Sequence, residues 1–239
     1  ALEPEEATLY RSCSGRALYL SADRIDIQHP TMKCLEEMSS PTVKGMARLR
    51  RMARYLKGTP RLALQYAFQD EPGVLTVKVD ADWAGDPTTR KSTSGFIFTA
   101  AGAPISWRSQ AQRCVALSTA EAELIALTES VKEAAWLSKL ATDDLKIEAR
   151  PLVIHEDNQA AIALSRDVKF SEKTKHMAVR WFYVTEMASN GTVKVVYVAT
   201  AEQLSDFLTK AQGPTQFVVS RHRIGVVEII NFTKKAHAV

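Results

Sequence analysis

The sequence predicts an α/β protein, of the α+β kind, in which a mixed sheet is flanked by helices. Three observations lead to this fold class. Helical periodicity fills the first 60 or so residues, strand-like segments then cluster together, and the remaining strands alternate with long helical segments. The 239 residues, 46% of them hydrophobic, suffice for one large domain or two small ones.

The last helix of the first region is predicted at residues 44–57. Its apolar residues recur at helical spacing, and Gly58 and Pro60 end it. Residues 43–61 carry seven lysines and arginines and no acid. Such a cluster favours a polyanionic partner, although it is also typical of a solvated helix face.

Strand-like segments follow from residue 62. They read LALQYAF (62–68), VLTVKVDADW (74–83), STSGFIFTA (92–100) and APISWRSQ (103–110). The second ends in two aspartates, Asp80 and Asp82, which strands disfavour. Either these residues cap a turn, or the strand holds a carboxylate in place for a function.

Helices and strands alternate in the second half. The sequence predicts helices at 117–141, 157–167, 176–189 and 200–210, with strands at 151–157 and 191–200. The composition shift near 62–72 is the predicted domain boundary.

Four acids stand where the chain passes from one element to another: Asp80, Glu123, Asp157 and Asp206. Strand ends and helix starts converge on one edge of an α/β sheet, so these side chains are expected to meet. Grouped carboxylates repel one another unless cations lie between them, and oxygen ligands suit Mg²⁺ or Mn²⁺. Two such ions are the standard apparatus of phosphodiester hydrolysis.

Each acid also has a structural interpretation. Asp157 suits a helix N-cap. Residues 118–121 read S-x-x-E, a capping box that gives Glu121 a structural role and leaves Glu123 as the better ligand candidate. Residues 200–203 read T-x-x-Q, a second capping-box match that leaves Asp206 without a capping duty.

The three cysteines are spread widely and form no C-x-x-C pair, which predicts free thiols rather than a disulfide framework or a zinc site. No apolar run approaches the length of a membrane helix, so no membrane partner is expected.

The order of these motifs resembles the ribonuclease H family, and in particular the ribonuclease H of copia-type retrotransposon Pol polyproteins. The resemblance rests on DADWAGDPTTRKSTSGFIFTAAGAPISWRSQ, ALSTAEAELIAL, EDNQAAIAL, KTKHMAVRWF and YVATAEQLSDFLTK. YRSCSGRALYLSADRIDI and ARLRRMARYLKGT resemble the tail of the preceding reverse transcriptase. The sequence departs from the family pattern at several positions, including Trp181 in place of histidine and Ser205 in place of alanine.

This resemblance implies a ribonuclease H-like fold with a five-stranded mixed sheet. It implies a helical reverse-transcriptase tail at 1–62, a ribonuclease H-like domain at 63–212 and a C-terminal extension at 213–239. The implied location is the cytoplasm, within the virus-like particle of a retroelement, or the nucleus.

The implied function is metal-dependent hydrolysis of the RNA strand of RNA–DNA hybrids during reverse transcription. The resemblance gives Asp80, Glu123, Asp157 and Asp206 the role of holding two Mg²⁺ or Mn²⁺ ions. The implied partners are the hybrid duplex and the upstream reverse transcriptase domains. The residues expected to contact nucleic acid are Arg90, Lys91, Ser92, Thr93, Asn158, Gln159, Lys173, Lys175 and His176, for which solvated polar loops are the competing interpretation.

Two other functions remain open on the sequence. One is a catalytically decayed nucleic-acid-binding or scaffold module of a Pol polyprotein. The other is an integrase or transposase, which shares the core but uses fewer acids in a different order. In this chain the glutamate, Glu123, comes second among the acids rather than last, and this order counts against an integrase or transposase.

Overall fold

The computed structural model describes residues 2–66, 75–146, 151–166 and 178–229. The chain forms two compact units, one made of residues 1–68 with 211–239 and the other of residues 69–210. Within the described residues, no helix combines the length and the apolar character needed to cross a membrane. The three cysteines are free thiols, as predicted.

The first unit is built from both ends of the chain. Its elements are α1 (Pro4–Leu20), η1 (Ile25–Ile27), α2 (Gln28–Leu35), α3 (Val43–Gly58), β1 (Leu62–Leu64), α8 (Pro214–Arg223) and β7 (Val226–Glu228). The predicted helix at 44–57 is confirmed as α3, whose first turn is capped by the Thr42 hydroxyl accepting from the Gly45 N–H at 2.9 Å. Helices α1, α2 and α3 bury Tyr10, Cys34 and Met46 in a common core.

The C-terminal segment packs within this same unit. Strand β7 pairs antiparallel with β1, and the Tyr55 ring contacts the Phe217 ring edge-on at 5.6 Å. The strand predicted at 62–68 is therefore shorter than expected and does not join the mixed sheet, because β7 supplies its hydrogen-bonding partner. Residues 213–229 belong to the first unit.

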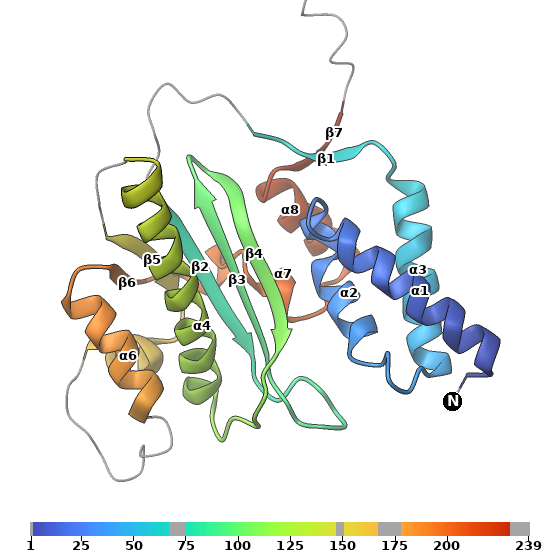
Figure 1. The fold of residues 1–239 in the computed structure, drawn as a ribbon, viewed down its shortest axis with the longest axis horizontal. Coiled ribbons are helices and arrows are strands. Elements are labelled where there is room, and N and C mark those ends of the chain that lie inside the picture. Colours follow the sequence, from blue (N-terminus) through green and yellow to red (C-terminus); the bar gives the residue numbers. More distant parts are fainter. Residues whose placement is uncertain (1, 67–74, 147–150, 167–177, 230–239) are drawn as a thin grey trace, which may run out of the picture. The chain divides into compact units, whose positions relative to one another are not determined.

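The second unit contains the five-stranded sheet. Its elements are β2 (Thr76–Asp82), β3 (Thr93–Ala100), β4 (Ala103–Ala111), α4 (Thr119–Lys139), η2 (Leu140–Asp144), β5 (Leu152–Glu156), α5 (Gln159–Arg166), α6 (Ala178–Ser189), β6 (Val193–Tyr197), η4 (Thr200–Glu202) and α7 (Asp206–Thr209). The strand order is β4-β3-β2-β5-β6. Strands β4, β3 and β2 are antiparallel, whereas β5 and β6 run parallel to β2. The predicted five-stranded mixed sheet is thus confirmed (Figure 1).

The two faces of this sheet carry different helices. Alternate residues of β2 and β3, including Val77, Val79 and Phe96, face the long helix α4 and form the main core with its Leu124 and Leu127. The short helix α7 packs against β2, β3 and β4, and its Leu208 and Thr209 approach Gly95 of β3 on the opposite face. The N-terminal half of α4 and the whole of α7 are thereby placed beside the end of β2.

Candidate active site

The candidate site lies where the two central strands separate. Strand β5 pairs with β2 only along Thr76–Lys78, while β2 continues to Asp82 in contact with β3. Beyond Lys78 the edge of β2 that faces β5 is therefore free of strand pairing. Polar side chains can enter this opening without disrupting the sheet.

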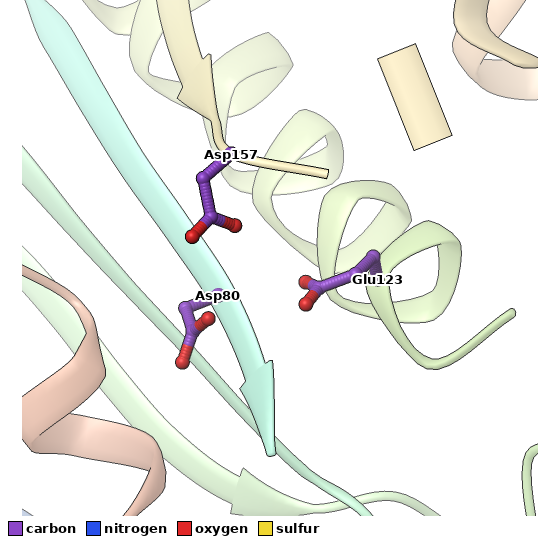
Figure 2. Close-up of side chains that lie close together, drawn as sticks. All are labelled: Asp80, Glu123 and Asp157. Carbon is purple, nitrogen blue, oxygen red and sulfur yellow. The ribbon is translucent and has the colours of Figure 1, made fainter. Parts of the chain in front are cut away.

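Three carboxylates from three separate elements meet at this opening. Asp80 comes from β2, Glu123 from α4, and Asp157 from the residue that follows β5, and each offers an oxygen within 4.8 Å of the others. Asp80 and Glu123 are buried, and Asp157 is half-buried. Figure 2 shows the three side chains directed toward a common space. The predicted meeting of these three acids is present in the structure.

A capping box positions Glu123. The Ser118 hydroxyl accepts from the Glu121 N–H at 3.2 Å, and the Glu121 carboxylate accepts from the Leu117 N–H at 2.6 Å. Glu121 is therefore engaged at the start of α4, as predicted. Glu123, two residues later, is directed to the acidic group instead.

Two further side chains attach the start of α4 to the sheet. The buried Gln112 amide donates to the Ser94 hydroxyl at 2.9 Å and to the Ala122 carbonyl at 2.8 Å. The Trp83 indole N–H donates to the Ala116 carbonyl at 3.1 Å. Because Ala122 immediately precedes Glu123, these contacts fix the place of the glutamate relative to β2 and β3.

Asp157 does not cap helix α5, although its place in the sequence suits that role. Helix α5 is capped by Asn158, whose side-chain oxygen accepts from the N–H groups of Ala160 and Ala161 at 3.0 and 3.1 Å. The Asp157 carboxylate thus remains available to the acidic group.

Asp206 lies beside the group but outside the set of three. It is the first residue of α7, and its carboxylate forms an ion pair with Lys210 at 2.9 Å. The Thr209 hydroxyl of the same helix donates to the Asp80 carboxylate. Asp206 is close enough for its negative charge to raise the pKa of Asp80. Asp206, which the sequence placed in the first turns of a helix at 200–210, thus begins α7, the helix whose Thr209 contacts Asp80.

The prediction of a capping box at residues 200–203 is wrong. The segment forms η4 and the four-residue α7 instead of one helix, and Thr200 makes no side-chain cap. Gln203 turns into the opening between the strands, where its amide donates to the Val79 carbonyl at 2.7 Å and to the His155 carbonyl at 3.4 Å. These are carbonyls of β2 and β5 respectively, so a buried side chain bridges the two strands where they separate.

The electrostatics of the site are dominated by burial and repulsion. Burial raises the pKa of Asp80 to about 7, assisted by the charges of Asp206 and Asp157 and opposed by the Thr209 hydrogen bond and by Lys210. Burial also raises the pKa of Glu123 to about 11, assisted by the charges of Glu156, Asp80 and Asp157. The grouped carboxylates are therefore poorly compensated by the protein's own charges.

Glu156 is a further acid that the sequence analysis did not select. It ends β5 on the same face as Leu152 and Ile154, and it is 0% exposed. Burial raises its pKa well above the ordinary value. In the sequence Glu156 stands two residues after Ile154 and four after Leu152. This spacing puts the three side chains on one face of a strand and is the sequence signal that marks Glu156 as buried.

The predicted nucleic-acid contacts occupy different environments. Arg90 is exposed and Lys91 half-buried, whereas Ser92 and Thr93 lie in the interior. The Ser92 hydroxyl accepts from the Ala84 N–H at 3.0 Å and so holds the turn after β2. Asn158 is half-buried and Gln159 exposed beside Asp157. Lys173, Lys175 and His176 lie outside the described residues.

Comparison with known proteins gives relatives along nearly the whole chain. It is 35% identical over 218 residues to the "Retrovirus-related Pol polyprotein from transposon TNT 1-94" of Nicotiana tabacum, covering 91% of this chain and 16% of that protein. It is 34% identical over 226 residues to the corresponding polyprotein from transposon RE1 of Arabidopsis thaliana, covering 94% of this chain and 15% of that protein. The chain thus spans about one-sixth of the length of these relatives.

No protein-family model matches the chain. Among solved structures, ribonuclease H1 of the archaeon Halobacterium salinarum aligns with 57% of this chain and 95% of its own, at 13% identity and a TM-score of 0.44. The described residues contain the predicted five-stranded mixed sheet flanked by helices. The chain belongs with the retrovirus-related Pol polyproteins of copia-type transposons and corresponds to a segment of them.

Proposed function

We propose that this chain is a metal-dependent ribonuclease H, which hydrolyses the RNA strand of RNA–DNA hybrids during reverse transcription of a retrotransposon. The observation that carries the proposal is the convergence of Asp80, Glu123 and Asp157 from three elements to within 4.8 Å. The Pol polyprotein relatives support it, since reverse transcription creates such hybrids.

The residues present fit a divalent cation. All the converging donors are carboxylate oxygens, the ligand type that Mg²⁺ and Mn²⁺ prefer. The buried Glu123 Oε2 has no hydrogen-bond partner, which is costly unless a cation or another donor approaches it. Asp80, Glu123 and Asp157 would hold the metal, with Asp206 next to Asp80 as a fourth carboxylate. When bound, two such ions activate water and stabilise the departing oxygen in phosphodiester hydrolysis.

The protein's own residues position these groups before substrate arrives. Thr209 fixes the Asp80 carboxylate through its hydroxyl, and the capping box with Gln112 fixes the start of α4. Such preorganisation matters because an error of about 1 Å in a site costs a large part of the rate. The site therefore has a rigid framework on the strand side and on the helix side.

Substrate binding is assigned to cationic and polar groups around the acids. Arg90 and Lys91, in the loop between β2 and β3, are placed to neutralise phosphates, which gives affinity without sequence preference. Gln159 is exposed two residues from Asp157, at a place suited to reading the 2′-hydroxyl groups of RNA. Hybrid binding is then expected to weaken as salt is raised.

Asp157→Asn tests the proposal, because it keeps the size of the side chain and removes its charge. Hybrid duplex with a labelled RNA strand is incubated with each protein in Mg²⁺ or Mn²⁺. Cleavage by the natural chain and its loss to background in the variant is the expected result. Glu186→Gln is the matched control, since Glu186 is exposed on α6, and it should cut normally.

Two results would reject this function. One is undiminished cleavage by the Asp157→Asn protein. The other is a natural chain that binds the hybrid but cuts it with neither metal, which would instead identify a non-catalytic nucleic-acid-binding module.

A further inference from the structure

Three exposed apolar residues lie together where β2 ends and α4 is about to begin. Trp83 follows the last residue of β2, and Val115 and Leu117 belong to the loop that leads into α4. These three residues are 45%, 47% and 74% exposed. The Trp83 indole N–H donates to the Ala116 carbonyl at 3.1 Å, which places Trp83 next to the residues on either side of Ala116. We call Trp83, Val115 and Leu117 the apolar ridge.

The apolar ridge adjoins the segments that carry two of the acids. Trp83 stands three residues after Asp80, so their backbones are at most about 11 Å apart. Leu117 stands six residues before Glu123 in the other segment. Successive nucleotides of one strand in a B-form duplex are about 3.4 Å apart along the helix axis. A duplex with a phosphodiester at the acids therefore has neighbouring nucleotides within reach of the ridge.

The ridge presents apolar groups that are already fixed in place. The indole of Trp83 has one polar donor and no acceptor, and the Ala116 carbonyl occupies that donor. The Leu117 N–H is held in the same way by the Glu121 carboxylate at 2.6 Å. Large apolar groups that lie together on a surface mark binding sites more often than scattered ones do. A ligand of the ridge is therefore recognised by shape and apolar contact.

Arginines flank the ridge. Arg113 is exposed two residues before Val115, and it forms no hydrogen bond or ion pair with another described residue. Arg180 of α6 approaches the same loop, where its guanidinium contacts the Cys114 Sγ at 4.0 Å. Apolar surface between cations suits a ligand whose apolar parts alternate with anions. Nucleic acid has this chemistry, because its sugars and base edges lie between phosphates.

We propose that the apolar ridge is a substrate-binding surface, on which Trp83 packs against sugars and base edges of the hybrid beside the nucleotide that is cut. Arg113 pairs with a neighbouring phosphate. The wide, shallow minor groove of an A-like duplex exposes the sugar and base edges that such a ring can contact. This inference rests on the function proposed above, and it adds recognition of shape to the phosphate contacts assigned to Arg90 and Lys91.

The test measures binding separately from cleavage. Fluorescence anisotropy of a labelled RNA–DNA hybrid is recorded with the Asp157→Asn protein, in Mg²⁺ and at several salt concentrations. Adding Trp83→Leu should weaken binding about 10-fold, and by the same factor at every salt concentration, because an apolar contact releases no counterions. Adding Arg113→Gln should instead lower the slope of log affinity against log salt by about 0.9, the value for one phosphate contact.

Two further variants separate a contact with substrate from a structural role. Trp83→Phe keeps an aromatic ring but removes the N–H that holds the Ala116 carbonyl, so it should retain most of the affinity. Trp136→Leu is the matched control, since Trp136 is also exposed but lies near the C-terminal end of α4. It is about 20 Å along the helix from Glu123, and its replacement should leave binding unchanged.

Unchanged affinity in Trp83→Leu overturns the inference and leaves the ridge to a protein partner. Equal losses in Trp83→Phe and Trp83→Leu also overturn it, because the N–H rather than the ring would then be responsible. If Trp83→Leu does not fold, Leu117→Gln decides. A loss of about threefold supports the inference, and normal binding refutes it.

Failure of the proposed function has a different signature. A natural chain that does not bind the hybrid contradicts the proposed function itself. A natural chain that binds the hybrid through the ridge, but cuts it with neither Mg²⁺ nor Mn²⁺, keeps the inference and rejects only the nuclease.

Discussion

Gly95 lies directly opposite Asp80 in the antiparallel pairing of β2 and β3. A Cβ at this glycine would come within 2.7 Å of the Thr209 Cγ2 and 2.9 Å of the Leu208 Cβ. The absence of a side chain therefore allows α7 to approach the sheet, and this approach brings the Thr209 hydroxyl to the Asp80 carboxylate.

Gly95→Ala is expected to displace α7 and to disturb Asp80 together with Asp206. Overpacking of this kind costs about 1–3 kcal/mol of folding free energy, and hybrid cleavage should fall by more than the loss of folded protein explains. Urea unfolding and cleavage rates measure the two effects. Gly15→Ala, within α1 and with nothing within 4 Å of the added carbon, is the control and should be neutral or stabilising. Unchanged cleavage in Gly95→Ala would show that the position of α7 is unimportant.

Gln203→Ala is expected to destabilise the second unit, because the buried Val79 carbonyl loses its donor where β2 and β5 separate. An unsatisfied buried acceptor costs about 1–3 kcal/mol. Chemical denaturation followed by circular dichroism gives the value. Gln159→Ala, at an exposed position, should change stability much less, and equal effects for the two variants would contradict a bridging role.

Lys210→Met is expected to make the metal-free protein less heat-stable, since this ammonium pairs with Asp206 and lowers the pKa of Asp80. Burial lowers the pKa of Lys210, but the Asp206 hydrogen bond and the charges of Asp80 and Asp206 raise it overall. Loss of a positive charge beside the site should also tighten Mn²⁺ binding. Calorimetric titration measures this change against Lys194→Met, an exposed control on β6. Weaker Mn²⁺ binding in Lys210→Met would refute this electrostatic role.

The metal-free protein is expected to lose stability as the pH rises. The pKa of Asp80 is raised to about 7 and that of Glu123 to about 11, so both bind protons more tightly in the folded than in the unfolded chain. Unfolding then becomes easier from about pH 4, where the unfolded carboxyls ionise, up through the folded pKa values. With a chelator present, the Tm recorded between about pH 5 and about pH 9 should fall as the pH rises.

Saturating Mg²⁺ should flatten this dependence, because a bound cation favours the ionised carboxylates. A chelated sample whose Tm is independent of pH would mean that the acids are compensated in some other way.

Local sequence rules predicted those parts of the site that depend on neighbours along the chain. The capping box at 118–121 distinguished the structural role of Glu121 from the ligand role predicted for Glu123. It could do so because Ser118 and Glu121 lie within one helical turn of each other. The alternation of residues 75–83 placed Asp80 on a strand, and that strand is β2. The five-stranded sheet was also predictable, since its strands are apolar and regular.

The same rules failed where contacts between residues far apart in the sequence determine the local structure. Gln203 fits a capping box locally, but an unpaired carbonyl of β2, 124 positions away, attracts its amide. Ser205, a departure from the family pattern, donates to the Gln203 side-chain oxygen at 2.7 Å and orients that amide. Glu156 was overlooked because an acid in a short apolar strand has no local partner that reveals its role. Helix α4 packs against β5, and after burial itself the charge of Glu156 raises the pKa of Glu123.

The pairing of β1 with β7 has a consequence for synthesis on the ribosome. Leu62 lies opposite Glu228, so the pairing that joins residues 62–64 to residues 226–228 cannot form until Glu228 has been translated. Every strand of the central sheet, by contrast, has been made once Tyr197 is joined. We expect the central sheet to fold first and the pairing of β1 with β7 to form afterwards.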